Sequence, residues 1–196
     1  MLRMQKVLEK LHAGQTEAVI IHKPSNIFYL SGYTGEGLLV FGHGFQAIIT
    51  DFRYTEQAEK QAPGFQVMMV EKGISHIMLA KQLLDEHAVT AARFEDDEVT
   101  VRSFRKMEEV LQGIALSPLD NVPEMVRCIK DETEIAAIEE ACAISCKAFE
   151  ALLPQIKPGI TEKQLQITLD NLLMEMGADS LAFDTIVASG ENGSLP

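Results

Sequence analysis

Residues 37–50 read GLLVFGHGFQAIIT and contain two apolar runs on either side of a short glycine-rich turn. The runs at 37–41 and 45–50 are rich in aliphatic and aromatic residues, which strands favour. Between them, Gly42, His43 and Gly44 have the composition of a tight turn, because glycine adopts the backbone angles that hairpin turns require. The stretch therefore predicts a β-hairpin, an antiparallel pair of strands.

Strands and helices alternate on both sides of this hairpin. The run EAVII at 17–21 predicts a strand, and an apolar residue recurs at helical spacing before it, at Met4, Val7, Leu8 and Leu11. Downstream the same alternation continues, with helices predicted over 53–62, 75–87 and 99–111 and strands over 65–70, 89–94 and 114–116. This order indicates an α/β fold with helices flanking the sheet, and the hairpin makes that sheet mixed rather than purely parallel.

The character of the chain changes at PLDNVP, residues 118–123, which reads as a short linker bracketed by two prolines. Residues 123–196 carry −8 of the total net charge of −12. We therefore expect two domains, 1–122 and 123–196.

The second piece opens with two predicted helices. Asp131 followed by Glu134 has the spacing of a capping box, and the apolar residues after it predict a helix to about Leu153. Thr161 followed by Gln164 has the same spacing and predicts a second helix over 161–176. The sequence FDTIVA at 183–188 then predicts a strand.

The composition excludes several classes of protein. The chain has 196 residues, with 17 Lys and Arg against 29 Asp and Glu, which argues against binding to nucleic acid or to an anionic membrane surface. It contains no run of 18 apolar residues, and its first residues lack the apolar core of a signal peptide. Three cysteines cannot all pair internally and no CxxC occurs, so we expect a reduced, cytoplasmic protein.

Spacing alone reveals no catalytic or metal-binding constellation. The five histidines are scattered, without HxxH or HExxH spacing. Cys142 and Cys146 lie four residues apart and could share a metal, but they fall on the apolar stripe of a predicted helix, which favours packing in a core. The acidic run at 95–98 precedes a predicted helix, where the helix dipole explains it without a cation.

Three polar residues follow the predicted strand at 45–50. Asp51, Arg53 and Tyr54 occupy a strand end, where functional side chains are frequent. The same residues are equally compatible with a structural ion pair, and the sequence leaves both interpretations open.

Five segments together carry a resemblance that no single motif establishes. They are PSNIFYLSGYTG (24–35), TDFRYTEQA (50–58), RCIKDETEIAAIEEA (127–141), IKPGITE (156–162) and FDTIVASGENGSLP (183–196). In their order and spacing they resemble the creatinase/prolidase/aminopeptidase P family of pita-bread metallopeptidases. The resemblance implies a creatinase-like N-terminal α/β domain, followed by the opening helices and first strand of a pita-bread α+β domain.

The resemblance also implies an activity and its cofactors. Members of the family hydrolyse Xaa-Pro bonds with two divalent ions, typically Mn, Co or Zn, that share an activated water. In the family the final segment is followed at once by a catalytic histidine, and the metal ligands lie later in the chain. Residues 1–196 are therefore expected to contain no catalytic residue and no metal ligand, and to be inactive alone. Asp184, a single carboxylate on a predicted strand, does not replace them.

A few residues match family positions of functional or structural interest. Phe183 and Ile186 match positions that line the substrate pocket near the scissile proline, although ordinary packing in a strand explains them equally well. Tyr33 and Thr34 match a loop that approaches the partner's active site in family dimers. Arg127 and Lys130 match an R-x-IK signature, for which we expect a structural role.

We therefore expect the N-terminal part of a Xaa-Pro aminopeptidase or dipeptidase acting on proline-containing peptides. Two alternatives stay open, namely a creatinase-like hydrolase of small C–N substrates and a metal-free binding or assembly module of the same fold. The two predicted helices of the second piece also carry long apolar faces. Because large exposed apolar patches promote association, we expect a homodimer or a poorly ordered C-terminal third.

Overall fold

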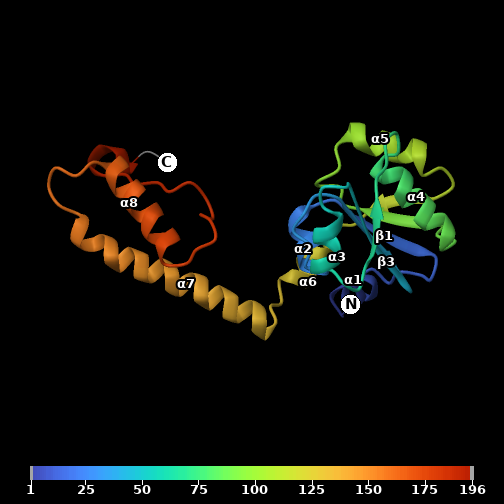
Figure 1. Cartoon of the computed structure of the whole chain (residues 1–196), viewed down its shortest axis with the longest axis horizontal. Coiled ribbons are helices and arrows are strands. Elements are labelled where there is room, and N and C mark those ends of the chain that lie inside the picture. The colour runs from blue at the N-terminus through green and yellow to red at the C-terminus, as the bar shows by residue number, and fades with distance from the viewer. Residues whose placement is uncertain (1, 195–196) are drawn as a thin grey trace. The chain divides into compact units, whose positions relative to one another are not determined.

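The computed structural model describes residues 2–194, and its contacts divide the chain into two units, residues 1–129 and residues 130–196 (Figure 1). Helix α6 (Val122–Arg127) belongs to the first unit because it contacts α1 (Leu2–Lys10) and α2 (Pro24–Ser31). The contacts thus separate the units after residue 129, whereas the sequence placed a domain boundary before Pro123.

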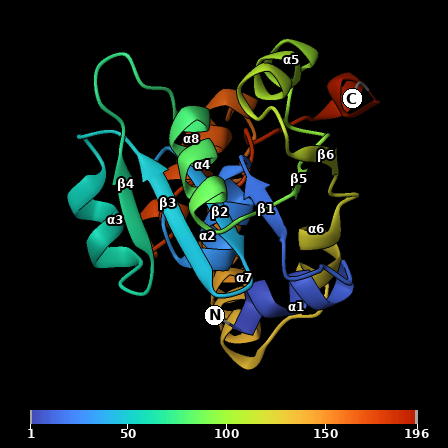
Figure 2. The ribbon, with the colours of Figure 1, turned by 90° about the vertical axis from the view of Figure 1, so that its right-hand side faces the viewer.

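The first unit contains a six-stranded sheet in the order β4-β3-β2-β1-β5-β6, which Figure 2 shows from left to right. Strand β2 runs antiparallel to both of its neighbours, and the remaining neighbouring pairs are parallel. The expected mixed sheet is therefore confirmed. The strands are β1 (Glu17–Ile21), β2 (Leu38–Gly42), β3 (Phe45–Thr50), β4 (Gln66–Met69), β5 (Ala91–Phe94) and β6 (Ala115–Pro118).

The predicted hairpin consists of β2 and β3. Gly42 pairs with Phe45 and Leu38 pairs with Ile49, so His43 and Gly44 alone form the turn. Gly44 has a φ of 85°, a left-handed conformation that glycine adopts without strain. The glycine-rich turn therefore sets the register of the whole central pair.

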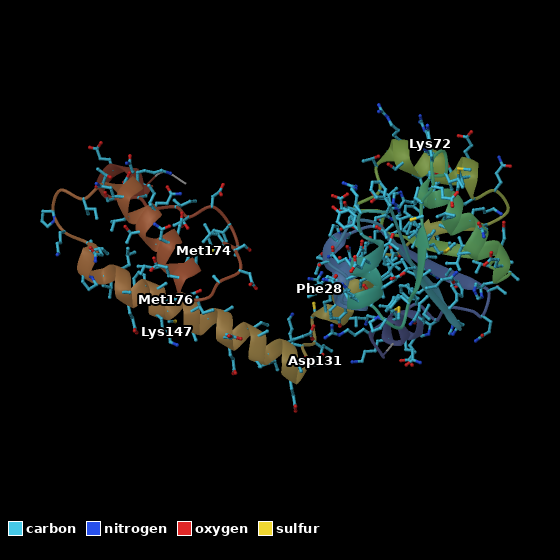
Figure 3. The ribbon with its side chains drawn as sticks, in the orientation of Figure 1. Phe28, Lys72, Asp131, Lys147, Met174 and Met176 are labelled. Atoms are coloured by element: carbon cyan, nitrogen blue, oxygen red, sulfur yellow. The ribbon has the colours of Figure 1, made fainter. Side chains whose placement is uncertain are left out.

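Helices cover both faces of this sheet (Figure 1). In β1, Val19 and Ile21 pack into one core and Ala18 and Ile20 into the other, as expected when successive side chains point to opposite faces. The first core contains residues of α1, α2, α6 and α3 (Thr55–Gln61), and the second contains residues of α4 (His76–Glu86) and α5 (Val101–Val110). Figure 3 shows these side chains densely packed around the sheet.

Two short helices of the first unit were not predicted. Helix α2 begins with Pro24 and ends before Gly32, whose φ of 81° is a left-handed C-terminal cap. Helix α6 begins with the last two residues of the stretch expected to be a linker, Val122 and Pro123, and both are buried. The two helices have only 8 and 6 residues, too few to be stable in isolation, so their stability comes from tertiary contacts.

The second unit consists of α7 (Glu132–Leu152), a 3₁₀ turn (Leu153–Gln155), α8 (Glu162–Glu175) and a 3₁₀ segment (Gly190–Ser194). Both predicted capping boxes are confirmed. Asp131, at the start of α7 in Figure 3, accepts a hydrogen bond from the Glu134 backbone, and Thr161 accepts one from the Gln164 backbone. The two capping boxes therefore determine where α7 and α8 begin.

The apolar stripe of α7 is largely exposed. Ile135, Ile138, Phe149 and Leu153 are between 46% and 54% exposed, whereas Ala148 and Leu152 are buried. Cys142 and Cys146 are also exposed, so the prediction that they pack in a core is wrong for this structure. Among the described residues, α8 is the helix that packs along α7, and one partner helix covers only one side of its surface. Residues 2–194 include no helix with the length and hydrophobicity needed to cross a bilayer.

Candidate functional site

The candidate site is built on the segment that follows α8, residues 183–194. The sequence predicted a strand at 183–188, and this prediction is wrong: the segment is irregular until the 3₁₀ turn at 190–194. A strand needs a neighbour to accept its backbone hydrogen bonds, and the described residues of the second unit contain no other strand. The segment therefore depends on other contacts to fix its course.

One carboxylate supplies those contacts. The Ser189 backbone N–H donates to Glu162 Oε1 at 2.6 Å, and the Ser189 hydroxyl donates to the same oxygen at 3.2 Å. The Asn192 side-chain amide donates to Oε1 at 3.0 Å and to Oε2 at 2.9 Å. Glu162 thus holds two residues that lie 27 and 30 positions further along the chain. We refer to Glu162, Ser189 and Asn192 as the Glu162 clamp.

The position of Glu162 in α8 leaves its side chain available for this role. Thr161 caps the helix, and the Gln164 side chain accepts a hydrogen bond from the Thr161 backbone at 2.9 Å. Glu162 is the next residue after the cap, and its negative charge suits the N-terminus of a helix. Hydrogen bonds from Asn192 and from the Ser189 backbone lower the pKa of Glu162 below its ordinary value, because they stabilise the ionised carboxylate.

The two predicted pocket residues of this segment are strongly exposed. Phe183 and Ile186 are each 79% exposed, so neither contributes to a core in the described structure. Asp184 between them is exposed as well. Large apolar side chains this accessible are free to contact a ligand or another surface. Their contact with a substrate remains a prediction.

The structure places the other two predicted residues, Tyr33 and Thr34, in different environments. Tyr33 is fully buried, and its hydroxyl donates to the Glu36 carbonyl at 2.9 Å and lies 3.1 Å from the Thr50 hydroxyl. Burial raises the pKa of Tyr33 above its ordinary value. Thr34 is exposed, and its backbone N–H donates to the Gln61 side chain at 3.0 Å. Only Thr34 of the two presents its side chain to the surface.

The polar residues after β3 form an ion pair. Arg53 Nη2 lies 2.7 Å from Asp51 Oδ2, and Arg53 also reaches Glu36 at 3.2 Å. The hydrogen bonds from Arg53 lower the pKa of Asp51. Asp51 and Arg53 line a cavity of about 480 Å³ at the carboxyl ends of β1 and β3, together with His22 and His76. Burial lowers the pKa of His22 to about 4, so its imidazole is neutral at pH 7.

The acidic run at 95–98 has a different role from the one expected. Thr100 caps the helix that follows it, whereas the buried carboxylate of Glu95 accepts hydrogen bonds from the His22 and Lys23 backbones at 2.6 and 2.8 Å. Glu95 therefore binds the backbone of the N-cap residue of α2, Lys23, and of the residue before it, and this helix lies far from Glu95 in the sequence. Asp97 pairs with the Lys23 ammonium at 2.6 Å.

Arg127 extends the hydrogen-bonded network around Glu95 through Asn26. Its guanidinium donates to the Asn26 side-chain oxygen at 2.9 Å and lies 5.8 Å from the centre of the Tyr29 ring. Asn26 donates in turn to Glu95 and to Glu124, both at 2.7 Å. Arg127 thus joins α6 to α2, which agrees with the structural role expected for it.

The described residues do not provide a metal site. Across residues 2–194 no three His, Cys, Asp or Glu side chains are grouped closely enough to hold a metal ion. The Glu162 clamp has one carboxylate, already occupied by amide and hydroxyl donors. A catalytic metal requires several fixed anionic or imidazole ligands, so the residues present do not fit the two ions that the family resemblance implies.

Comparison with known protein families places these observations in context. Residues 3–129 match the creatinase/prolidase N-terminal domain, and residues 136–196 match metallopeptidase family M24. The chain belongs to the creatinase/prolidase family. The resemblance drawn from the five sequence segments is thereby confirmed. The Glu162 clamp lies in the M24 part of this family member, and the six-stranded sheet is its creatinase/prolidase N-terminal domain.

Individual relatives agree with this assignment. The chain is 37% identical over 194 residues to the uncharacterized peptidase YqhT of Bacillus subtilis, covering 96% of this chain and 54% of that protein. It is 26% identical over 200 residues to a Xaa-Pro dipeptidase of Pyrococcus horikoshii, covering 99% and 54%. The solved structure of a Xaa-Pro dipeptidase from Bacillus anthracis matches with a TM-score of 0.92 at 29% identity, covering 100% of this chain and 55% of that one. The chain spans about half the length of the curated relatives it matches.

Sequence reasoning found the family but missed the clamp. It used Thr161 and Gln164 as a capping box and assigned no role to Glu162, because the partners of Glu162 are brought to it only by the fold. The signal available was Glu162, the last residue of the IKPGITE segment, because the capping box does not use its carboxylate.

Proposed function

We propose that this chain is the N-terminal portion of a metal-dependent Xaa-Pro aminopeptidase or dipeptidase, which hydrolyses the bond preceding proline. The observation that supports this most strongly is the match to the Bacillus anthracis Xaa-Pro dipeptidase, which extends over the whole chain and 55% of that enzyme. The M24 match over residues 136–196 adds the metallopeptidase class. Three free cysteines fit a cytoplasmic location, where thiols stay reduced.

The proposal divides the work between this chain and residues that it does not contain. Two divalent ions in the intact enzyme would activate the water for hydrolysis, and the ligands of those ions would lie outside residues 1–196. The described residues hold no grouped ligand set, so we propose that the 196-residue chain is inactive alone.

This chain would contribute to substrate binding and assembly. Phe183 and Ile186 are apolar and accessible, properties that suit contact with the flat ring of proline. In a homodimer, Thr34 would approach the partner's active site from the surface loop at 31–35, with the buried Tyr33 holding that loop in place. These roles rest on the family match at those positions.

The test compares the 196-residue chain with a chimera in which the remainder of the Bacillus subtilis relative follows Pro196. Both are assayed with Mn²⁺ on Xaa-Pro dipeptides and on longer peptides, and intact mass is measured on the same samples. We expect hydrolysis by the chimera, its loss on chelation, and no hydrolysis by the chain alone. Longer peptides cleaved in preference to dipeptides would identify an aminopeptidase.

Two results would contradict the proposal. Hydrolysis by the chain at a mass of 21.7 kDa would place a metal site within these residues. A folded, metal-loaded chimera that cleaves no Xaa-Pro peptide would favour one of the alternatives, a hydrolase of small C–N substrates if it cleaves creatine and a binding or assembly module if it cleaves neither.

A further inference from the structure

The Glu162 clamp determines where residues 183–194 lie in the second unit. In the part of the chain that the structure describes, the hydrogen bonds that tie this segment to α7 and α8 all end on the Glu162 carboxylate. Within the segment, hydrogen bonds join only near neighbours, such as the Asn192 backbone to the Ser189 carbonyl at 3.1 Å. Among the described residues, loss of the carboxylate would therefore remove the hydrogen bonds that tie the segment to α8.

The clamp lies close in sequence to the exposed apolar residues. Ser189 follows Ile186 by three positions and Phe183 by six. Fixing the Ser189 backbone at 2.6 Å from Glu162 limits the positions that both apolar side chains reach, because a short chain tethered at one end cannot travel far. The other end of the segment is connected to the C-terminus of α8 through residues 176–182, and Gly177, just after the helix, has a φ of 105°.

We propose that Glu162 is a positioning residue for substrate binding, which holds the segment carrying Phe183 and Ile186 in its binding geometry. This inference rests on the proposed function, since it assigns Glu162 a part in placing the residues that would contact the substrate. Glu162 itself does not touch the substrate. Because Glu162 already holds the segment in place before the substrate binds, the segment loses less conformational entropy on binding.

The chemistry of the clamp suggests a substitution that keeps its size. In Glu162→Gln, one side-chain oxygen still accepts from the Ser189 backbone, but the new amide group faces the Asn192 amide with two donors and no acceptor. The exchanged pair E162Q/N192D restores a donor opposite an acceptor at that point. Recovery of binding in the double variant would therefore point to this contact, because a second substitution would not repair a general loss of stability.

A matched control separates the clamp from the effect of charge at a helix N-terminus. Glu132 occupies the position directly after the capping residue of α7, as Glu162 does in α8. It is exposed, and the described residues give it no hydrogen-bond partner on another segment. Glu132→Gln therefore removes the same charge from the same helical position without breaking a clamp.

The first measurement uses the 196-residue chain and does not depend on activity. An amide proton bound to a carboxylate changes its NMR chemical shift when the carboxylate titrates. We expect the Ser189 amide proton to titrate at a pH below the ordinary range for glutamate, because the clamp lowers the pKa of Glu162. The titration should vanish in E162Q and persist in E132Q. A Ser189 amide that does not titrate in the wild-type chain would overturn the clamp.

The second measurement uses the active chimera described above. We expect E162Q to raise KM about tenfold while kcat changes less than about twofold, the pattern of lost substrate binding. E132Q should leave both constants unchanged, and E162Q/N192D should recover most of the lost affinity. Equal KM values for E162Q and E132Q, or a failure of the exchanged pair to recover KM, would overturn the positioning role. A chimera inactive on every Xaa-Pro substrate would instead contradict the proposed function, and the NMR titration would still decide whether the clamp exists.

Discussion

The side-chain amide of Asn26 donates to the buried carboxylate of Glu95 at 2.7 Å, across 69 positions of sequence. Glu95 also accepts hydrogen bonds from the backbone N–H groups of His22 and Lys23. Lys23 is the N-cap residue of α2, and its N–H is one of those that a helix leaves unpaired at its N-terminus. The helix that precedes the SGYTG loop is therefore capped by a residue from the end of β5 rather than by its own sequence.

Removal of this cap should destabilise the first unit. In Glu95→Ala three donors, two backbone N–H groups and the Asn26 amide, lose an acceptor in a buried site. We expect the free energy of unfolding to fall by about 3 kcal/mol, since each buried donor left unpaired costs about 1–3 kcal/mol and Asn26 retains Glu124. All three tyrosines of the chain lie in the first unit, so urea unfolding followed by tyrosine fluorescence reports on that unit alone.

Asp96→Ala is the control for this change, because Asp96 belongs to the same acidic run but is exposed. Its effect should stay within about 0.5 kcal/mol, the usual range for surface substitutions. Equal unfolding midpoints for the two variants would show that Glu95 does not cap α2.

His22 should make the stability of the first unit depend on pH. Burial lowers the pKa of His22 to about 4, while the unfolded chain binds a proton near the ordinary value of 6.5. Between these values the unfolded state binds more protons than the folded state, so stability falls as the pH drops from about 6.5 toward 4. We expect wild type to lose about 2 kcal/mol more than His22→Asn between pH 7 and pH 4.5.

The same tyrosine-monitored unfolding, repeated at the two pH values, measures this difference. His12→Asn is the matched control, because His12 is exposed and its left-handed backbone, with a φ of 51°, suits asparagine. An identical pH dependence for His22→Asn and wild type would contradict the prediction.

Gly35 should be required by the buried ring of Tyr33. A Cβ atom at position 35 would lie 2.3 Å from the Tyr33 hydroxyl oxygen, closer than atoms approach in proteins. Tyr33 cannot easily move, because it is fully buried and its hydroxyl bonds to the Glu36 carbonyl. We expect Gly35→Ala to cost about 2 kcal/mol in tyrosine-monitored unfolding, as overpacking does.

Gly14→Ala supplies the comparison for this glycine, since the nearest atom to its added Cβ would be 4.0 Å away. It should change the unfolding midpoint little. A Gly35→Ala variant as stable as Gly14→Ala would show that Tyr33 can leave the position it occupies in the core.

Local signals explain which elements could be predicted from sequence. The hairpin of β2 and β3 joins neighbouring segments through a two-residue turn, and the capping boxes of α7 and α8 lie within four residues. In each case the deciding residues are adjacent in sequence, so the pattern alone predicts the structure. Helix α2 was missed because its cap, Glu95, lies about 70 positions away.

The candidate site was harder to predict because its contacts are not local. Phe183 and Ile186 were expected on a strand, but strand formation depends on a neighbouring strand, and the described residues of the second unit contain none. Cys142 and Cys146 were expected in a core, but burial depends on what covers α7. Glu162 binds residues 27 and 30 positions away, which no spacing rule anticipates.

The exposed face of α7 should cause the 196-residue chain to associate. Ile135, Ile138 and Phe149 of α7, and Leu153 directly after it, are each about half exposed, and an apolar surface of this kind is more stable when covered. We expect light scattering to show dimers whose fraction rises with concentration, and residues 1–129 alone to remain monomeric, because that unit has two closed cores of its own. Ile138→Asp should shift the chain toward monomer. Ala143→Asp, which adds the same charge at another exposed position of α7, should not. A wild-type chain that stays monomeric at high concentration, with the amides of α7 fully protected from hydrogen exchange, would contradict this prediction.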